Sequence, residues 1–157
     1  MYQYGETPLF TYEKIAKITG LNPDHHYLEL GAGRGRGAAF LSHFFKCPVT
    51  CYEVIKEFTM HMELQKEKCS GSFKVVNKNF LKGIDKINQY SVIYIYGLDL
   101  SESDVETLCS ILKNCSEYTQ IITISYSLEG YLNFRSPIKK IPVSFAWGKT
   151  LAYLHII

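Results

Sequence analysis

The most informative stretch of the sequence reads Glu29-Leu-Gly31-Ala-Gly33-Arg-Gly35 and directly follows a short apolar run. Glycine lets a chain turn sharply and leaves bare backbone against which a ligand can lie. The glycines stand between a predicted strand and a helix that is predicted to follow. This arrangement predicts a nucleoside-binding loop, and the alternative is a glycine-rich turn that holds no ligand.

An acidic residue supports the nucleoside interpretation. Glu53 ends the next predicted strand, at roughly the separation expected for a carboxylate that accepts both ribose hydroxyls. A dinucleotide loop has the pattern GxGxxG, but counted from Gly31 the last position is Arg36, and a looser match from Gly33 needs a longer strand. Glu29 can bind the ammonium group of a methionine moiety. These features favour S-adenosylmethionine over a nicotinamide dinucleotide.

The remaining chain alternates strand-like and helix-like patterns. The predicted strands cover residues 27–30, 49–52, 73–76, 91–96 and 120–124. The predicted helices cover residues 11–19, 37–45 and 55–68, with a fourth that opens with the capping box Ser103-Asp-Val-Glu106 and ends near residue 113. Two last β-like runs, 141–147 and 150–157, flank Gly148-Lys149. We therefore predict one α/β domain over 1–157: a Rossmann-like, doubly wound, mostly parallel sheet with a C-terminal antiparallel hairpin.

The composition is that of an ordinary globular protein. The chain has 157 residues, 46% hydrophobic and 20% charged, and a net charge of only +2, which gives no strong nucleic-acid signal. Its five cysteines form no CxxC pair, so we expect no disulfide framework and no metal site. The sequence shows no signal-peptide pattern and no apolar stretch of transmembrane length, so a cytoplasmic protein is expected. The oligomeric state stays open.

Several further stretches occur in an order found in one enzyme family. They are Tyr4-Gly-Glu-Thr7, the glycine loop, Glu53, Asn79-Phe-Leu81, Leu132-Asn-Phe-Arg135, Val143-Ser144, Gly148-Lys149 and Tyr153-Leu-His155. On these stretches the chain resembles the non-SET, class I protein lysine methyltransferases. The likeness is greatest to the histone lysine methyltransferases of the disruptor-of-telomeric-silencing type. The resemblance implies an S-adenosylmethionine-dependent methyltransferase with the seven-stranded architecture of that class.

The resemblance also assigns cofactor contacts. Residues 1–20 would form an N-terminal lid loop and helix, and Thr7 would contact the cofactor carboxylate. The side-chain oxygen of Asn79 would accept a hydrogen bond from the adenine amino group and Phe80 would stack on the ring; a loop asparagine and a core phenylalanine are the alternative. The full predicted set is Tyr4, Thr7, Glu29, Gly31, Ala32, Gly33, Gly35, Glu53, Asn79 and Phe80.

The acceptor side departs from the family. The family carries an Asn-Asn-Phe segment after the fourth strand that presents the substrate amine, whereas this chain reads Tyr96-Gly-Leu-Asp99. Five aromatic residues lie on segments predicted to meet at the carboxyl ends of the strands: Tyr2, Tyr4, Tyr96, Trp147 and Tyr153. Of these, Tyr96, Trp147 and Tyr153 are the predicted catalytic channel, in which desolvation would keep a lysine amine neutral. Core packing is the alternative for each one.

The acceptor therefore has several interpretations. A protein lysine is the leading one, and a small-molecule or lipid amine is the second. The missing asparagine favours a third, a cofactor-binding domain with little catalysis.

Overall fold

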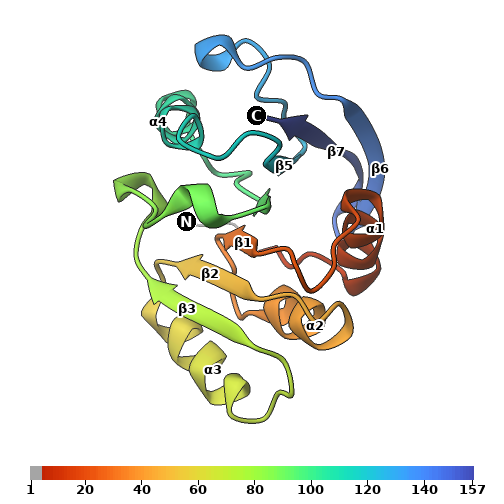
Figure 1. Ribbon diagram of the computed structural model, residues 1–157, viewed down its shortest axis with the longest axis vertical. Helices are drawn as coiled ribbons and strands as arrows, with labels where there is room; N and C mark the ends of the chain where they lie inside the picture. Colours follow the sequence, from red (N-terminus) through yellow and green to blue (C-terminus); the bar gives the residue numbers. More distant parts are fainter. Residues whose placement is uncertain (1–4) are drawn as a thin grey trace.

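A computed structural model describes residues 5–157, which build one seven-stranded mixed sheet (Figure 1). In chain order the strands are β1 (Tyr27–Leu30), β2 (Val49–Glu53), β3 (Phe73–Asn77), β4 (Val92–Ile95), β5 (Gln120–Ile124), β6 (Lys139–Phe145) and β7 (Gly148–Ile156). Their order in the sheet is β3-β2-β1-β4-β5-β7-β6. β1 to β5 pair in parallel, and β7 runs antiparallel to both β5 and β6. The predicted doubly wound sheet with a C-terminal hairpin is confirmed.

Helices cover both faces of the sheet. They are α1 (Leu9–Thr19), α2 (Arg36–Phe44), α3 (Lys56–Lys66) and α4 (Glu102–Leu112), with short 3-10 turns η1 (Phe80–Lys82), η2 (Ile87–Gln89) and η3 (Tyr131–Asn133). Side chains of α1, α2 and α3 share one buried cluster, and those of α4 belong to a second. In Figure 1, α4 and α1 accordingly lie on opposite sides of the strands.

The first strand shows why the sheet is covered on both faces. All four residues of β1 are buried, as expected for a parallel strand between two helix layers. Because side chains alternate along a strand, Tyr27 joins the cluster under α1 and α2 while Leu28 and Leu30 join the cluster under α4. Glu29 therefore points to the α1 face, where a carboxylate is buried among apolar groups.

The terminal hairpin differs from the prediction in its turn. Phe145 pairs with Gly148, so Ala146 and Trp147 make the turn and Gly148-Lys149 begin β7. The predicted turn is wrong because it rests on glycine being common in turns. Gly148 has a positive φ of 144° but is the first residue of β7. β7 lies between β5 and β6, and β6 forms the sheet edge.

The start of α4 also differs from the prediction. The helix begins at Glu102, and its cap is Ser101, whose side chain accepts a hydrogen bond from the Asp104 N–H at 3.2 Å. The Asp104 carboxylate accepts the Ser101 N–H in return, at 3.0 Å. The predicted box at Ser103 has the same pattern two residues later, so spacing alone does not choose between them.

The strand order reverses between β1 and β4. The loops that follow these two strands diverge, and such a switch point is where open α/β sheets bind ligands. Within residues 5–157, no helix is both long and apolar enough to cross a membrane.

Candidate functional site

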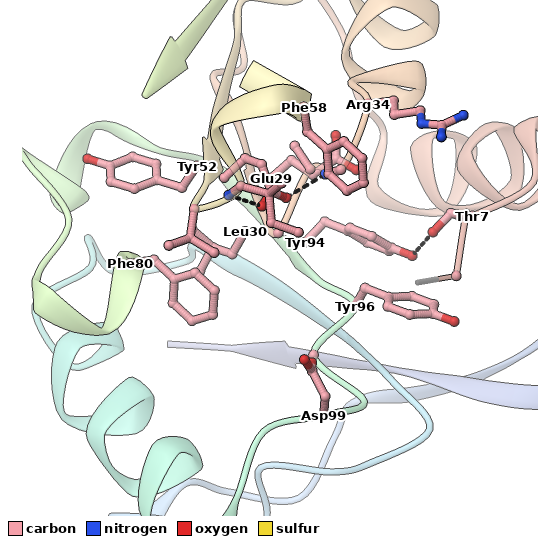
Figure 2. A pocket seen from close by; sticks show the side chains of 18 of the residues that line it. Thr7, Glu29, Leu30, Arg34, Tyr52, Phe58, Phe80, Tyr94, Tyr96 and Asp99 are labelled. Carbon is pink, nitrogen blue, oxygen red and sulfur yellow. Dashed lines mark hydrogen bonds between the residues drawn. The ribbon is translucent and has the colours of Figure 1, made fainter. Parts of the chain in front are cut away.

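A cavity of about 510 Å³ lies at the carboxyl ends of β1 to β4 (Figure 2). The loops after all four strands line it, with residues 31–34 from the first, 53–55 from the second, 78–81 from the third, and Tyr96, Gly97, Asp99 and Leu100 from the fourth. Residues 5–7 of the N-terminal segment and Tyr12 of α1 also line it. The cavity therefore occupies the switch point of the sheet.

The glycine loop turns sharply at the bottom of the cavity. Gly31, Gly33 and Gly35 all have positive φ angles, of 79°, 55° and 76°, which residues other than glycine rarely adopt. A Cβ built at Gly31 would meet nothing within 4 Å, so bare backbone faces open space there. At Gly35 it would instead collide with the Met62 side chain. Gly31 thus leaves room for a ligand, and Gly35 lets α2 pack closely on α3.

Glu53 is a buried carboxylate at the end of β2. Its Oε2 accepts the N–H of Gly33 at 2.8 Å, and its Oε1 accepts the N–H of Ile55 at 2.8 Å. These two backbone bonds fix the carboxylate between the glycine loop and the start of α3. Each oxygen keeps a further lone pair, so the group can still accept two hydroxyl groups of a ligand.

Glu29 is a second buried carboxylate, with a different environment. Its Oε1 accepts the hydroxyl of Tyr12, whereas its Oε2 is buried without a hydrogen-bond partner among residues 5–157. Burial raises the pKa of Glu29 to about 7; the Tyr12 hydrogen bond acts against this shift, and the nearby Glu53 adds to it. A buried carboxylate oxygen without a partner is costly, so the site is suited to a cationic group. Sequence reasoning missed Tyr12, because nothing distinguishes it from other aromatic residues on the inner face of a helix.

The loop after β3 forms an apolar wall with a polar start. Asn79 lines the cavity, but its side-chain oxygen accepts the Leu81 N–H at 2.9 Å and so caps η1. One lone pair of that oxygen is therefore used by the backbone. Phe80 lines the cavity and packs against the core under α4. Phe58 of α3, which the sequence did not suggest, also lines the cavity, and Figure 2 shows its ring well apart from that of Phe80.

The N-terminal segment lies across the tyrosines of β4 and its following loop. Thr7 is buried, and its hydroxyl lies 2.6 Å from the Tyr94 hydroxyl. A Cβ at Gly5 would collide with the hydroxyl of Tyr96, so the glycine permits this close approach. Tyr2 and Tyr4, both predicted to contribute, lie outside the described residues.

The predicted acceptor residues are brought together only in part. Trp147 donates its indole N–H to the Tyr96 hydroxyl at 2.9 Å and stacks on Phe145, with ring centroids 5.2 Å apart. Asp99, from the loop after β4, points its carboxylate into the cavity (Figure 2). Tyr153 lies on β7 and is not among the residues that line the cavity.

Within residues 5–157, no group of three or more His, Cys, Asp or Glu side chains is placed so that it could hold a metal ion. No protein-family model matches the chain, and no curated protein matches it. Many solved structures do match its fold.

Three of these structures illustrate the match. An RNA methyltransferase from Salinibacter ruber, in complex with S-adenosyl-L-homocysteine, superposes with a TM-score of 0.80 at 15% identity, over 97% of this chain and 93% of that one. A methyltransferase from Pyrococcus furiosus gives 0.68 at 20% identity, over 99% and 86%. A SAM-dependent methyltransferase from Geobacter sulfurreducens, also with S-adenosyl-L-homocysteine, gives 0.63 at 14%, over 79% of this chain and only about half (51%) of that chain. The chain thus has the class I methyltransferase fold.

Proposed function

We propose that the protein is an S-adenosylmethionine-dependent methyltransferase. The observation that carries this proposal is the pair of buried carboxylates around the glycine loop. Glu53 is fixed by two backbone N–H groups and can accept a ribose diol. Glu29 lines the same cavity, and its buried Oε2 has no hydrogen-bond partner among residues 5–157, so this carboxylate suits an ammonium group. A nucleoside that carries an amino acid would satisfy both.

Other lining residues fit the rest of such a ligand. Gly31 offers bare backbone, and Phe80 and Phe58 offer apolar ring faces for a base. Thr7, held by Tyr94, would lie against the amino-acid end. When bound, S-adenosylmethionine supplies an electrophilic methyl group on a sulfonium. The protein then needs neither a metal nor a covalent nucleophile, and its contribution is to hold the acceptor in line.

We further propose that the acceptor is an amine, with a protein lysine as the leading candidate. Tyr96 and Trp147 form an aromatic edge beside the cavity, and aromatic faces attract a methylated cation. Asp99 in the same wall could take up a hydrogen bond from the amine. A small-molecule or lipid amine would meet the same groups.

A second candidate is an exocyclic amine of an RNA base. It is favoured by the likeness to the Salinibacter ruber RNA methyltransferase, because this chain covers 93% of that protein's length. An aromatic ring such as Tyr96 can also stack on a base. Transfer of tritiated methyl groups to total RNA and to lysine-rich peptides, with nuclease and protease controls, would separate the two candidates.

Calorimetric titration tests the cofactor. The native protein should bind S-adenosylmethionine and its demethylated product with micromolar affinity. Glu53→Ala should weaken this about 100-fold or more, since it removes two hydrogen bonds to a charged group, worth about 1.5–3 kcal/mol each. Glu63→Ala, which removes a solvent-exposed glutamate of α3, is the matched control and should bind like the native protein. Absence of binding by the native protein would overturn the proposal.

A further inference from the structure

Tyr12 holds Glu29 by one oxygen only. Its hydroxyl donates to Oε1, and the second oxygen, Oε2, stays buried and without a hydrogen-bond partner among residues 5–157. Both side chains line the cavity. With Oε1 anchored, the carboxylate cannot rotate freely, so its unpaired oxygen keeps one direction.

Tyr12 is itself fixed by its surroundings. It is 5% exposed, and a Cβ at Gly37 would collide with its ring, so only glycine leaves the space that the ring fills. On its other side the ring lies 5.5 Å from that of Tyr94, centroid to centroid, and Tyr94 contacts Thr7. Helix α1 and the helix after the glycine loop therefore meet at this side chain, and the N-terminal segment contacts its neighbour Tyr94.

Among residues 5–157, five titratable side chains act on Glu29. They are Tyr12 of α1, Tyr27 of β1, Cys51 and Glu53 of β2, and Tyr94 of β4. None of these five is a cation. Burial raises the pKa of Glu29 to about 7, so near neutral pH part of the population carries a proton there. An ammonium group placed beside Oε2 would favour the ionised form.

We propose that Tyr12 is a positioning residue that aims Oε2 of Glu29 at the amino group of the cofactor, and that binding of this amino group releases a proton from Glu29. The proposal rests on the proposed function. The step is balanced: the O–H bond of the carboxylic acid breaks, the ammonium group keeps its own protons, and the released proton passes to the buffer.

Calorimetry with two probes tests the positioning role. S-adenosylhomocysteine carries the amino acid, and 5′-methylthioadenosine lacks it. Tyr12→Phe removes only the hydroxyl. It should lower the affinity for S-adenosylhomocysteine about tenfold and leave the affinity for methylthioadenosine unchanged. Tyr118→Phe, at a side chain that is 74% exposed, is the control and should change neither. Equal losses for both probes, or no loss for either, would overturn the positioning role.

The same titrations test whether binding releases a proton. Runs at pH 6.5 in buffers of different ionisation enthalpy should reveal proton release with S-adenosylhomocysteine, and none with methylthioadenosine or with Glu29→Gln. Affinity for S-adenosylhomocysteine should also fall as pH drops below about 7, because Glu29 must first lose its proton. Equal proton release with both probes, or no release at all, would overturn the coupling. If the native protein binds neither probe, the proposed function itself fails.

Discussion

The two walls of the cavity are held in different ways. The cofactor wall, meaning Glu29, the glycine loop and Glu53, consists of buried carboxylates and backbone whose positions follow from strand ends and tight turns. The acceptor wall, meaning Tyr96 and Asp99, consists of loop side chains, and Trp147, which donates a hydrogen bond to Tyr96, is 51% exposed. Backbone-built recognition suits a ligand shared by many proteins of one fold. Recognition by exposed side chains can change without disturbing the fold, which suits an acceptor that differs between them.

The largest effect is expected from a substitution in the cofactor wall, and a matched glycine elsewhere separates the loss of ligand binding from backbone strain. Gly31 and Gly20 both have positive φ, 79° and 66°, and a Cβ at either would meet nothing within 4 Å. Gly31→Ala and Gly20→Ala should therefore lose similar stability, about 1–2 kcal/mol, in thermal melts. Only Gly31→Ala should weaken cofactor binding, by about 100-fold, since its methyl group enters the cavity. Equal binding by both variants would break the assignment of the cofactor wall.

A smaller effect is expected in the acceptor wall. Tyr96→Phe removes the hydroxyl that accepts the Trp147 indole N–H. Once an acceptor is known, kcat/KM should fall about tenfold, in line with the loss of one hydrogen bond that orients the wall. The affinity for S-adenosylhomocysteine should stay within about twofold of the native value. Loss of cofactor affinity in this variant would show that the two walls are not separable.

The stability of the segment between β5 and β6 should be pH-dependent. His155 of β7 accepts the Leu128 N–H on Nε2 at 3.2 Å and donates Nδ1–H to the Arg135 carbonyl at 3.2 Å, which holds the segment between β5 and β6. Burial lowers the pKa of His155, against a smaller opposing effect of the Arg135 hydrogen bond. The unfolded state thus binds the proton more readily, so stability is full above about pH 6.5 and is lost as pH falls through the native pKa.

Thermal melts from pH 5 to pH 8 check this. His155→Gln should be less stable and should flatten the loss at acid pH. What remains is the part due to His26, whose pKa burial also lowers, and the opposite contribution of Glu29, whose raised pKa of about 7 makes the folded state gain stability as pH falls. A pH profile of unchanged steepness would contradict the role given to His155.

The smallest effect concerns the helix that follows the acceptor loop. Ser101→Ala should cost about 1 kcal/mol of stability in denaturant unfolding, because it removes the side-chain cap of α4. Ser103→Ala should cost about 0.5 kcal/mol or less, because it removes an exposed hydroxyl that contacts the Ser101 hydroxyl at 3.0 Å but does not cap the helix backbone. The reverse order would restore the capping box suggested by the sequence alone.

The sequence predicts the fold well because the signals for parallel strands are local. Alternating strand and helix patterns and the glycine-rich turn after β1 are each contained in a few consecutive residues. Local pattern fails where two sites compete, as with the two serines before α4, or where a glycine is not the turn, as with Gly148 in the hairpin.

The site is predictable to the extent that it follows the strand ends. Strand ends placed Glu29, Glu53 and Asn79 along one cavity, because parallel strands finish at the same edge. Tyr12 could not be foreseen: it reaches Glu29 from a helix 17 residues earlier, and only tertiary packing brings them together. The sequence likewise could not show that the Asn79 oxygen bonds its own loop, since that depends on the local backbone path.

A crystal structure of the protein with S-adenosylhomocysteine tests the central claim most directly. The account predicts one molecule in the cavity, with its ribose hydroxyls on the Glu53 carboxylate and its amino group on Oε2 of Glu29. An empty cavity at millimolar ligand, or a nucleoside bound elsewhere, would contradict it.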